Sequence, residues 1–218
     1  MSERDNRNTK MIHDETVNNL HQGLVAVLQA GSEYTVHTRI NWQPNEDFPN
    51  EVYTFDIAIA SSDSAVHVEN GQLYLSPRAC VVTVIDVVTK DDYETEFYDK
   101  PDTLVLSCVD EYCIFDPTAE VLRPPFQAYR KVEAVWQIRR STKHGVFFSV
   151  CRFRLEVSGT FLAVSECGCP MDEEDLFDCQ NRLEFALARK EPNQKEIVGL
   201  TTKIKRLEAR ILGERKEQ

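Results

Sequence analysis

The chain has 218 residues, of which 42% are hydrophobic and 28% are charged. This length suits one core of roughly 150 residues with an appendage, and the composition excludes a disordered chain. No run approaches the roughly 18 apolar residues of a membrane span, and the polar start MSERDNRNTK lacks the apolar region of a secretion signal. We therefore expect a cytoplasmic protein without membrane contact, and the net charge of −11 restricts any nucleic-acid binding to a local patch.

The first elements are a helix and a strand behind a polar N-terminal segment. Residues 1–13 are polar and are expected to be flexible. Asp14 and Thr16 are both candidates for the N-cap of the helix that follows. Residues 36–42 then alternate apolar and polar side chains, as a half-buried strand does. The helix is predicted from apolar residues that recur on one helical face: Val17, Leu20, Leu24, Val27 and Leu28.

Two further strands each carry one aspartate. In VYTFDIAIA, Asp56 shares a face with Ala58 and Ala60, and these small neighbours leave room above its carboxylate. Residues 79–89, ACVVTVIDVVT, are apolar on both faces and rich in β-branched residues, as a strand in the middle of a sheet is. Asp86 is the only charge in this strand, and a buried charge is costly unless it is paired or binds a metal. Two such carboxylates at equal depth can hold a divalent cation, although each alone can also be a strand-end residue capped by N–H groups.

The rest of the chain reads as strands followed by helices. A charged loop and a short helix precede a strand at EYCIFDP, and shorter strands continue to Val164, so the fold class is α/β, with α+β an equally good label. Residues 166–218 form a helical C-terminal tail behind a domain at residues 14–165. A short coiled coil at residues 195–213 either docks on its own domain or pairs two chains as a homodimer. Its apolar residues recur at three-four-three-four spacing: Ile197, Leu200, Ile204, Leu207 and Ile211.

Six sequence blocks follow one another in a characteristic order: DETVNNLHQGL, FDIAIA, VIDVVT, a charged stretch that ends at Lys100, EYCIFDP and VLRPPFQAYR. This order resembles the Uma-two family of restriction-endonuclease-like proteins, over roughly residues 14–165. The resemblance implies a PD-(D/E)XK-like nuclease core, with a mixed central sheet and flanking helices. It also implies that Asp56 and Asp86 bind magnesium or manganese and that Lys100 steadies the attacking water or the scissile phosphate.

Other positions extend or weaken this resemblance. The Val87 carbonyl is a candidate further metal ligand, and Glu96 matches the acidic position of the family just before the lysine. His21 falls near the place where the first helix of relatives often carries a histidine. Asp86 replaces a glutamate of the family, and Pro101 disfavours helical geometry at Lys100, so the lysine could point elsewhere.

A basic stretch between residues 123 and 154 is the predicted contact for DNA phosphates. It contains eight basic residues and one acidic residue. Alternatively, exposed arginines only keep the strands of a sheet soluble. The residues predicted to contact DNA are Arg123, Arg130, Lys131, Arg139 and Arg140.

Two hypotheses of function follow. The first is a magnesium-dependent endonuclease that hydrolyses DNA phosphodiester bonds through Asp56, Asp86 and Lys100. The second is a catalytically inactive nuclease-fold protein that acts as an interaction or oligomerisation module, which the net charge, Pro101 and the acidic residues between 91 and 99 favour.

Overall fold

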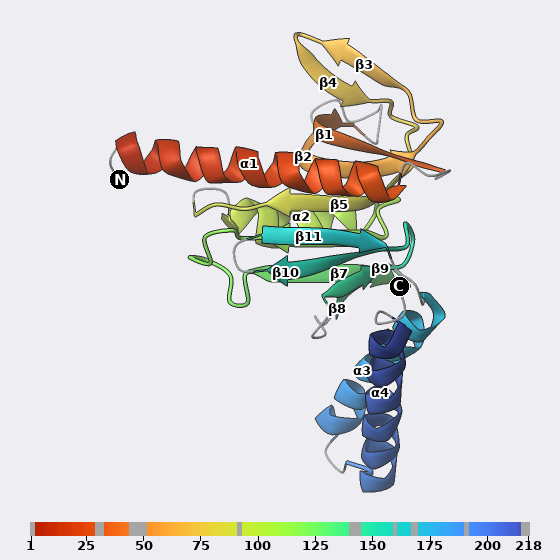
Figure 1. Ribbon diagram of the computed structural model, residues 1–218. Helices are drawn as coiled ribbons and strands as arrows, with labels where there is room; N and C mark the ends of the chain where they lie inside the picture. The colour runs from red at the N-terminus through yellow and green to blue at the C-terminus, as the bar shows by residue number, and fades with distance from the viewer. Residues whose placement is uncertain are drawn as a thin grey trace.

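Eight strands form one mixed sheet in the order β3-β4-β1-β2-β5-β6-β7-β8 (Figure 1). The fold is that of a computed structural model, which describes residues 3–28, 33–43, 52–90, 93–139, 145–158, 161–166, 170–189 and 192–214. Neighbouring strands are antiparallel, except that β1 pairs with β4 and β5 pairs with β6 in parallel. The strands are β1 (Tyr34–Trp42), β2 (Tyr53–Ser61), β3 (Val66–Glu69), β4 (Gln72–Leu75), β5 (Val81–Val87), β6 (Glu111–Phe115), β7 (Phe126–Val132) and β8 (Val135–Arg139).

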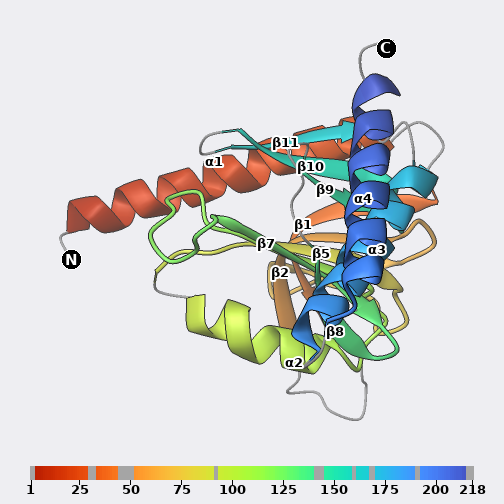
Figure 2. The same cartoon turned by 90° about the horizontal axis from the view of Figure 1, so that it is seen from below.

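Helix α1 (Glu3–Leu28) and a second, antiparallel sheet cover one face of the large sheet. The second sheet contains β9 (Val146–Phe148), β10 (Phe153–Ser158) and β11 (Phe161–Glu166) in the order β11-β10-β9. The view from below separates α1 and this small sheet from α2 on the opposite side of the large sheet (Figure 2). The apolar stripe of α1 is buried as predicted, against a core that includes Ile57, Ile85 and Leu155.

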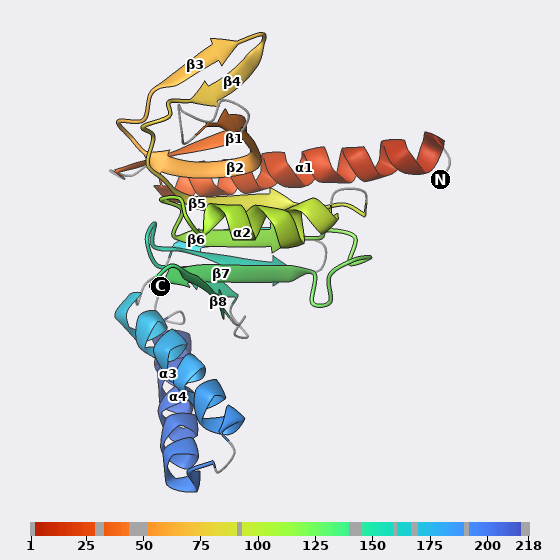
Figure 3. The same ribbon diagram turned by 180° about the vertical axis from the view of Figure 1, so that it is seen from behind.

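The opposite face of the large sheet is covered by the π-helical turn η1 (Thr95–Asp99) and helix α2 (Lys100–Leu104), which lie over β5 and β6 (Figure 3). The core on this face includes Trp42, Val84 and Tyr112, with Phe97 of η1 and Leu104 of α2 packed against them. Strand β5 is therefore buried on both faces along its whole length, which confirms the prediction from its apolar run.

Helix α1 begins earlier than predicted. Residues 1–13 were expected to be flexible, but α1 already begins at Glu3. Asp14 therefore lies inside the helix and not at its start. Its carboxylate accepts a hydrogen bond from Arg39 Nη2 at 2.6 Å, which ties α1 to β1. Residues 3–13, which were expected to be flexible, are therefore helical, although side chains such as Met11 and Ile12 are exposed.

Helices α3 (Pro170–Ala188) and α4 (Gln194–Glu214) form an antiparallel hairpin beyond the β8 end of the large sheet (Figures 1 and 3). Leu200, Leu207 and Ile211 of the predicted coiled-coil stripe are buried against α3 within the same chain. That stripe is therefore occupied by the chain's own helix, and a homodimer through α4 stays a prediction that would need another face. Overall, the described residues have a mixed α+β fold with flanking helices and a C-terminal helix, as the fold-class prediction states. None of the helices in the described ranges has the length and apolar content that a membrane span requires.

Candidate active site

Asp56 and Asp86 lie at the end of the β2–β5 ladder, each bound to the backbone of the opposite strand. The two strands pair through Ile57 with Ile85 and Ala58 with Val84. One step further, the Asp56 N–H donates to Asp86 Oδ1 at 3.1 Å, and the Val87 N–H donates to Asp56 Oδ2 at 2.9 Å. Each carboxylate thus accepts a hydrogen bond from the backbone of the opposite strand, in the position where a ladder carbonyl would otherwise accept it. The backbone of each strand therefore fixes the carboxylate of the other.

The neighbouring strand β1 is distorted beside this pair. Its register joins Thr38 to Ile57 and Ile40 to Phe55, and Arg39 between them has a φ of 49°. A left-handed backbone at a non-glycine residue is unfavourable and is found most often at constrained or functional positions. The strained residue Arg39 of β1 therefore lies beside Asp56 of β2.

Lys100 is the cation of the cluster. Its Nζ donates to Asp86 Oδ2 at 2.8 Å and to the Thr54 carbonyl at 2.9 Å, and it forms an ion pair with Glu96. Asp86 is 1% exposed and Lys100 is 7% exposed. Burial alone would lower the pKa of Lys100, but the Asp86 and Glu96 carboxylates outweigh it and raise that pKa, so the ammonium is charged.

Pro101 does not turn Lys100 away from the site. It lies in the first turn of α2, and Lys100 before it is still helical. Lys100 continues directly from η1, so Glu96 and Lys100 are four residues apart on one helical face. The structure therefore brings Lys100 into contact with Asp86 and Glu96, and it joins Asp56 to Asp86 through the Asp56 N–H, whereas their catalytic roles stay predictions.

Glu96 is the third carboxylate of the cluster. Burial and the nearby Asp86 carboxylate raise the pKa of Glu96 to about 8, against the opposite effect of Lys100. The Tyr112 hydroxyl donates to the Glu96 carbonyl at 2.8 Å and lies 3.3 Å from Glu96 Oε2. Glu96 therefore keeps its proton to a higher pH than an exposed glutamate does.

His13, which the sequence did not single out, is the histidine at the site. Its Nε2 lies 3.2 Å from Asp56 Oδ2, and both side chains are 20% exposed. The hydrogen bond to Asp56 raises the pKa of His13. His21, the predicted accessory residue, lies about 12 Å further along α1 and interacts with His37 of β1 instead. A helix prediction that began before Asp14 could have found His13, because it would have placed His13 on the same face as the buried Val17.

The predicted DNA contact at Arg139 is wrong. Arg139 is 5% exposed, and its Nη1 donates to Glu111 Oε1 at 3.0 Å, while its guanidinium lies 4.4 Å from the centre of the Phe177 ring of α3. Glu111 is fully buried and also accepts hydrogen bonds from the Ser149 N–H and hydroxyl at 2.8 and 2.9 Å. This arginine neutralises a buried carboxylate and cannot reach a phosphate.

The other basic residues that were predicted to contact DNA have different surroundings. Arg130 forms an ion pair with Glu174 of α3, and Lys131 donates to the Ser107 carbonyl at 2.6 Å. Arg123 is exposed. Arg140 lies outside the described residues. Within the part of the chain that is described, the basic stretch is therefore used largely for contacts inside the protein.

The carboxylates of Asp56 and Asp86 suit a magnesium or manganese ion that takes its remaining ligands from water and substrate. The described residues contain no group of three or more His, Cys, Asp and Glu side chains that could hold a metal. Mg²⁺, however, commonly takes one or two carboxylates and completes its shell with water and substrate phosphates. Asp56 and Asp86 supply hard oxygen donors of this kind, and the Val87 carbonyl stays a candidate ligand.

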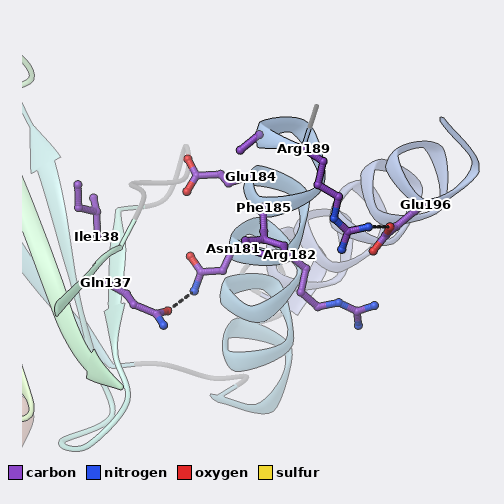
Figure 4. A pocket seen from close by; sticks show the side chains of 9 residues that line it. Gln137, Ile138, Asn181, Arg182, Glu184, Phe185, Arg189 and Glu196 are labelled. Atoms are coloured by element: carbon purple, nitrogen blue, oxygen red, sulfur yellow. Dashed lines mark hydrogen bonds and ion pairs between the residues drawn. The ribbon is translucent and has the colours of Figure 1, made fainter. Parts of the chain in front are cut away.

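A groove between β8 and α3 lies apart from this cluster (Figure 4). Asn181 Nδ2 donates to Gln137 Oε1 at 2.9 Å across it, and Arg189 lies over the Phe185 ring and pairs with Glu196 at 3.0 Å. None of the residues lining the groove belongs to the Asp56–Asp86–Lys100 cluster. The groove therefore adds nothing to the candidate active site.

Comparison with known proteins finds similar chains among solved structures. No protein-family model and no curated protein matches the chain. A crystal structure described as a "putative nuclease belonging to DUF820" from Anabaena variabilis is 11% identical, covers 64% of this chain and 73% of its own, and superposes with a TM-score of 0.47. At this identity and TM-score, the likeness decides neither family membership nor activity.

Proposed function

We propose that the chain is a metal-dependent endonuclease that hydrolyses DNA phosphodiester bonds. The proposal depends on one observation: a buried Asp86–Lys100 ion pair lies beside Asp56 at the end of the β2–β5 ladder, where both carboxylates are fixed by backbone N–H groups. A buried group of charges is costly to keep, and such groups are common at functional sites. The Asp56 carboxylate and His13 form the more exposed side of the cluster, from which a phosphate would approach.

The chain's own residues would divide the work. Asp56 and Asp86 would hold the cation, and Mg²⁺ or Mn²⁺, when bound, supplies polarisation of the phosphate and a more acidic water. Lys100 would turn from Asp86 to stabilise the negative charge that develops on the phosphate. His13 would hold a proton at Nε2 next to Asp56. Contact with DNA would be local, with Arg123 as the exposed basic candidate.

A second candidate is a catalytically inactive interaction or oligomerisation module. The observation that favours it is the burial of Asp86 and Lys100, whose charged atoms already bond to each other and to the backbone. In this alternative the cluster only holds β5 and α2 together.

Metal binding and DNA cleavage separate the two candidates. We expect the wild type to bind Mg²⁺ or Mn²⁺ in calorimetry and to cleave plasmid DNA only with metal. Asp56→Asn should lose both properties, whereas Asp63→Asn, the same change at an exposed turn residue, should keep them. Circular dichroism of each variant controls for folding. Absence of binding and cleavage in the wild type at millimolar metal would overturn the endonuclease proposal in favour of the inactive module.

A further inference from the structure

Two exposed cysteines lie side by side at the start of two parallel strands. In the β5–β6 pairing, Thr83 lies opposite Glu111, an offset of 111 − 83 = 28 residues. The Asp110 N–H donates to the Val82 carbonyl at 2.9 Å, which extends the contact toward the beginning of both strands. Cys80 and Cys108 are separated by the same offset, 108 − 80 = 28, so the continued register brings them next to each other.

The position of the Cys108 sulfur agrees with this register. Cys108 Sγ donates to the Val81 carbonyl at 3.3 Å and lies 3.9 Å from the Ala79 carbonyl, which are the two carbonyls that flank Cys80. Neighbouring strands lie about 4.8 Å apart, which falls within the range of about 4.4–6.8 Å between the Cα atoms of a disulfide. The geometry thus suits a covalent link between the two sulfurs.

The two thiols also differ in access from the other cysteines that the structure describes. Cys80 and Cys108 are exposed, whereas Cys113, Cys151 and Cys179 are buried. Burial of its sulfur and the nearby Cys80 raise the pKa of Cys108 to about 11, so Cys108 is a protonated thiol at neutral pH. A small oxidant can therefore reach the pair and not the other three described cysteines.

We propose that Cys80 and Cys108 form a reversible dithiol–disulfide pair that small-molecule disulfides oxidise. The Cys80 thiolate attacks one sulfur of the small disulfide, forms a mixed disulfide and releases one thiolate. The Cys108 thiol then gives up its proton, and its sulfur attacks the Cys80 sulfur and expels the second thiolate. Two protein thiols are oxidised to one disulfide, and the small disulfide is reduced to two thiols.

The link would close a loop around the candidate active site. Cys80 directly precedes β5, which carries Asp86, and Cys108 lies between α2, which begins at Lys100, and β6. Oxidation would therefore join both ends of a segment that contains Asp86, Glu96 and Lys100. The pairing of the sulfurs does not depend on whether this segment is catalytic.

Thiol mapping of the full-length protein tests the pair. After incubation with oxidised glutathione, we expect Cys80 and Cys108 to lose alkylation by iodoacetamide together, the protein mass to fall by two hydrogen atoms, and a Cys80–Cys108 peptide to appear. Dithiothreitol should reverse all three changes. Cys113 and Cys151, alkylated after denaturation, serve as internal controls and should stay reduced.

Single variants distinguish an internal link from ordinary glutathionylation. In Cys108→Ser, Cys80 should keep the glutathione as a stable mixed disulfide, because no second sulfur can expel it. The proposal is wrong if wild-type Cys80 also accumulates this adduct, if it links two chains instead, or if neither cysteine reacts under conditions that oxidise a model dithiol.

Discussion

Glutamine in place of Glu96 should change how the stability of the protein depends on pH. The folded chain holds a proton on Glu96 up to a pKa of about 8, whereas a glutamate in the unfolded chain loses it near its ordinary pKa of 4.5. Because the pKa is raised on folding, this contribution to stability is complete below the unfolded pKa. It declines as the pH rises and is lost as the pH passes through about 8. Glutamine cannot ionise, so this decline should be absent in Glu96→Gln.

The size of the effect follows from the pKa shift. One pKa unit corresponds to about 1.4 kcal/mol, so a shift from 4.5 to about 8 corresponds to roughly 4–5 kcal/mol in the free energy of unfolding. At pH 5 the variant should be nearly as stable as the wild type, since glutamine resembles a protonated carboxyl group beside the Tyr112 hydroxyl. By pH 9 the variant should be the more stable protein by several kcal/mol.

Urea unfolding followed by circular dichroism at pH 5, 7 and 9 measures this difference directly. The titration of His13 contributes to both proteins and cancels in the comparison. Glu94→Gln, at an exposed glutamate two residues earlier, is the matched control and should show no such trend. A difference between Glu96→Gln and the wild type that stays constant from pH 5 to 9 would refute the reasoning.

Two further predictions concern the ion pair and a close backbone contact. Lys100→Met should destabilise the fold by roughly 3–5 kcal/mol because it leaves the buried Asp86 charge unpaired, while Asp86→Asn with Lys100→Met should cost far less than the two single changes together. Fully additive costs in urea unfolding would contradict a direct coupling. Gly145→Ala should lower the thermal midpoint more than Gly71→Ala: both glycines have positive φ, but only at Gly145 would the new methyl group lie 1.9 Å from the Leu155 carbonyl oxygen. Equal shifts in differential scanning calorimetry would mean that β10 moves aside.

The parts of the site that sequence reasoning found are those with a local signal. A run of β-branched residues predicts a buried strand, and the structure confirms it for β5. Because a charge within such a strand needs a partner, Asp86 could be singled out without a structure. The position of Lys100 came from the order and spacing of sequence blocks. The concern about Pro101 was wrong in effect, because a proline in the first turn of a helix leaves the preceding side chain free to reach the site.

The parts that were missed depend on contacts between distant segments. His13 meets Asp56 across 43 residues of sequence, and nothing in the N-terminal pattern specifies that approach. Arg139 was counted as a surface charge because its partner Glu111 lies 28 residues earlier, in a strand that otherwise reads as apolar. A count of charges along a stretch therefore overestimates the basic surface whenever acidic partners lie elsewhere in the chain.

The C-terminal hairpin illustrates the same limit. The apolar stripe of α4 was recognised from its spacing, but the stripe's partner was left open between the chain's own domain and a second chain. Helix α3 carries a matching stripe, in which Leu176, Cys179, Leu183 and Ala186 recur at three-four-three spacing. Two stripes of equal period joined by a short connection favour a hairpin within one chain.

Helix α3 makes side-chain contacts at one border of the large sheet. Strand β8 is the last strand of the large sheet, and unpaired border strands are sites at which proteins aggregate through strand addition. Asn181 of α3 bonds to β8, where Val135 and Ile138 are already exposed. A fragment that ends before residue 170 would lack the α3 contacts to β8, and Arg130 would lose its ion pair with Glu174. Without these contacts, the border strand should be more open to strand addition from a second chain.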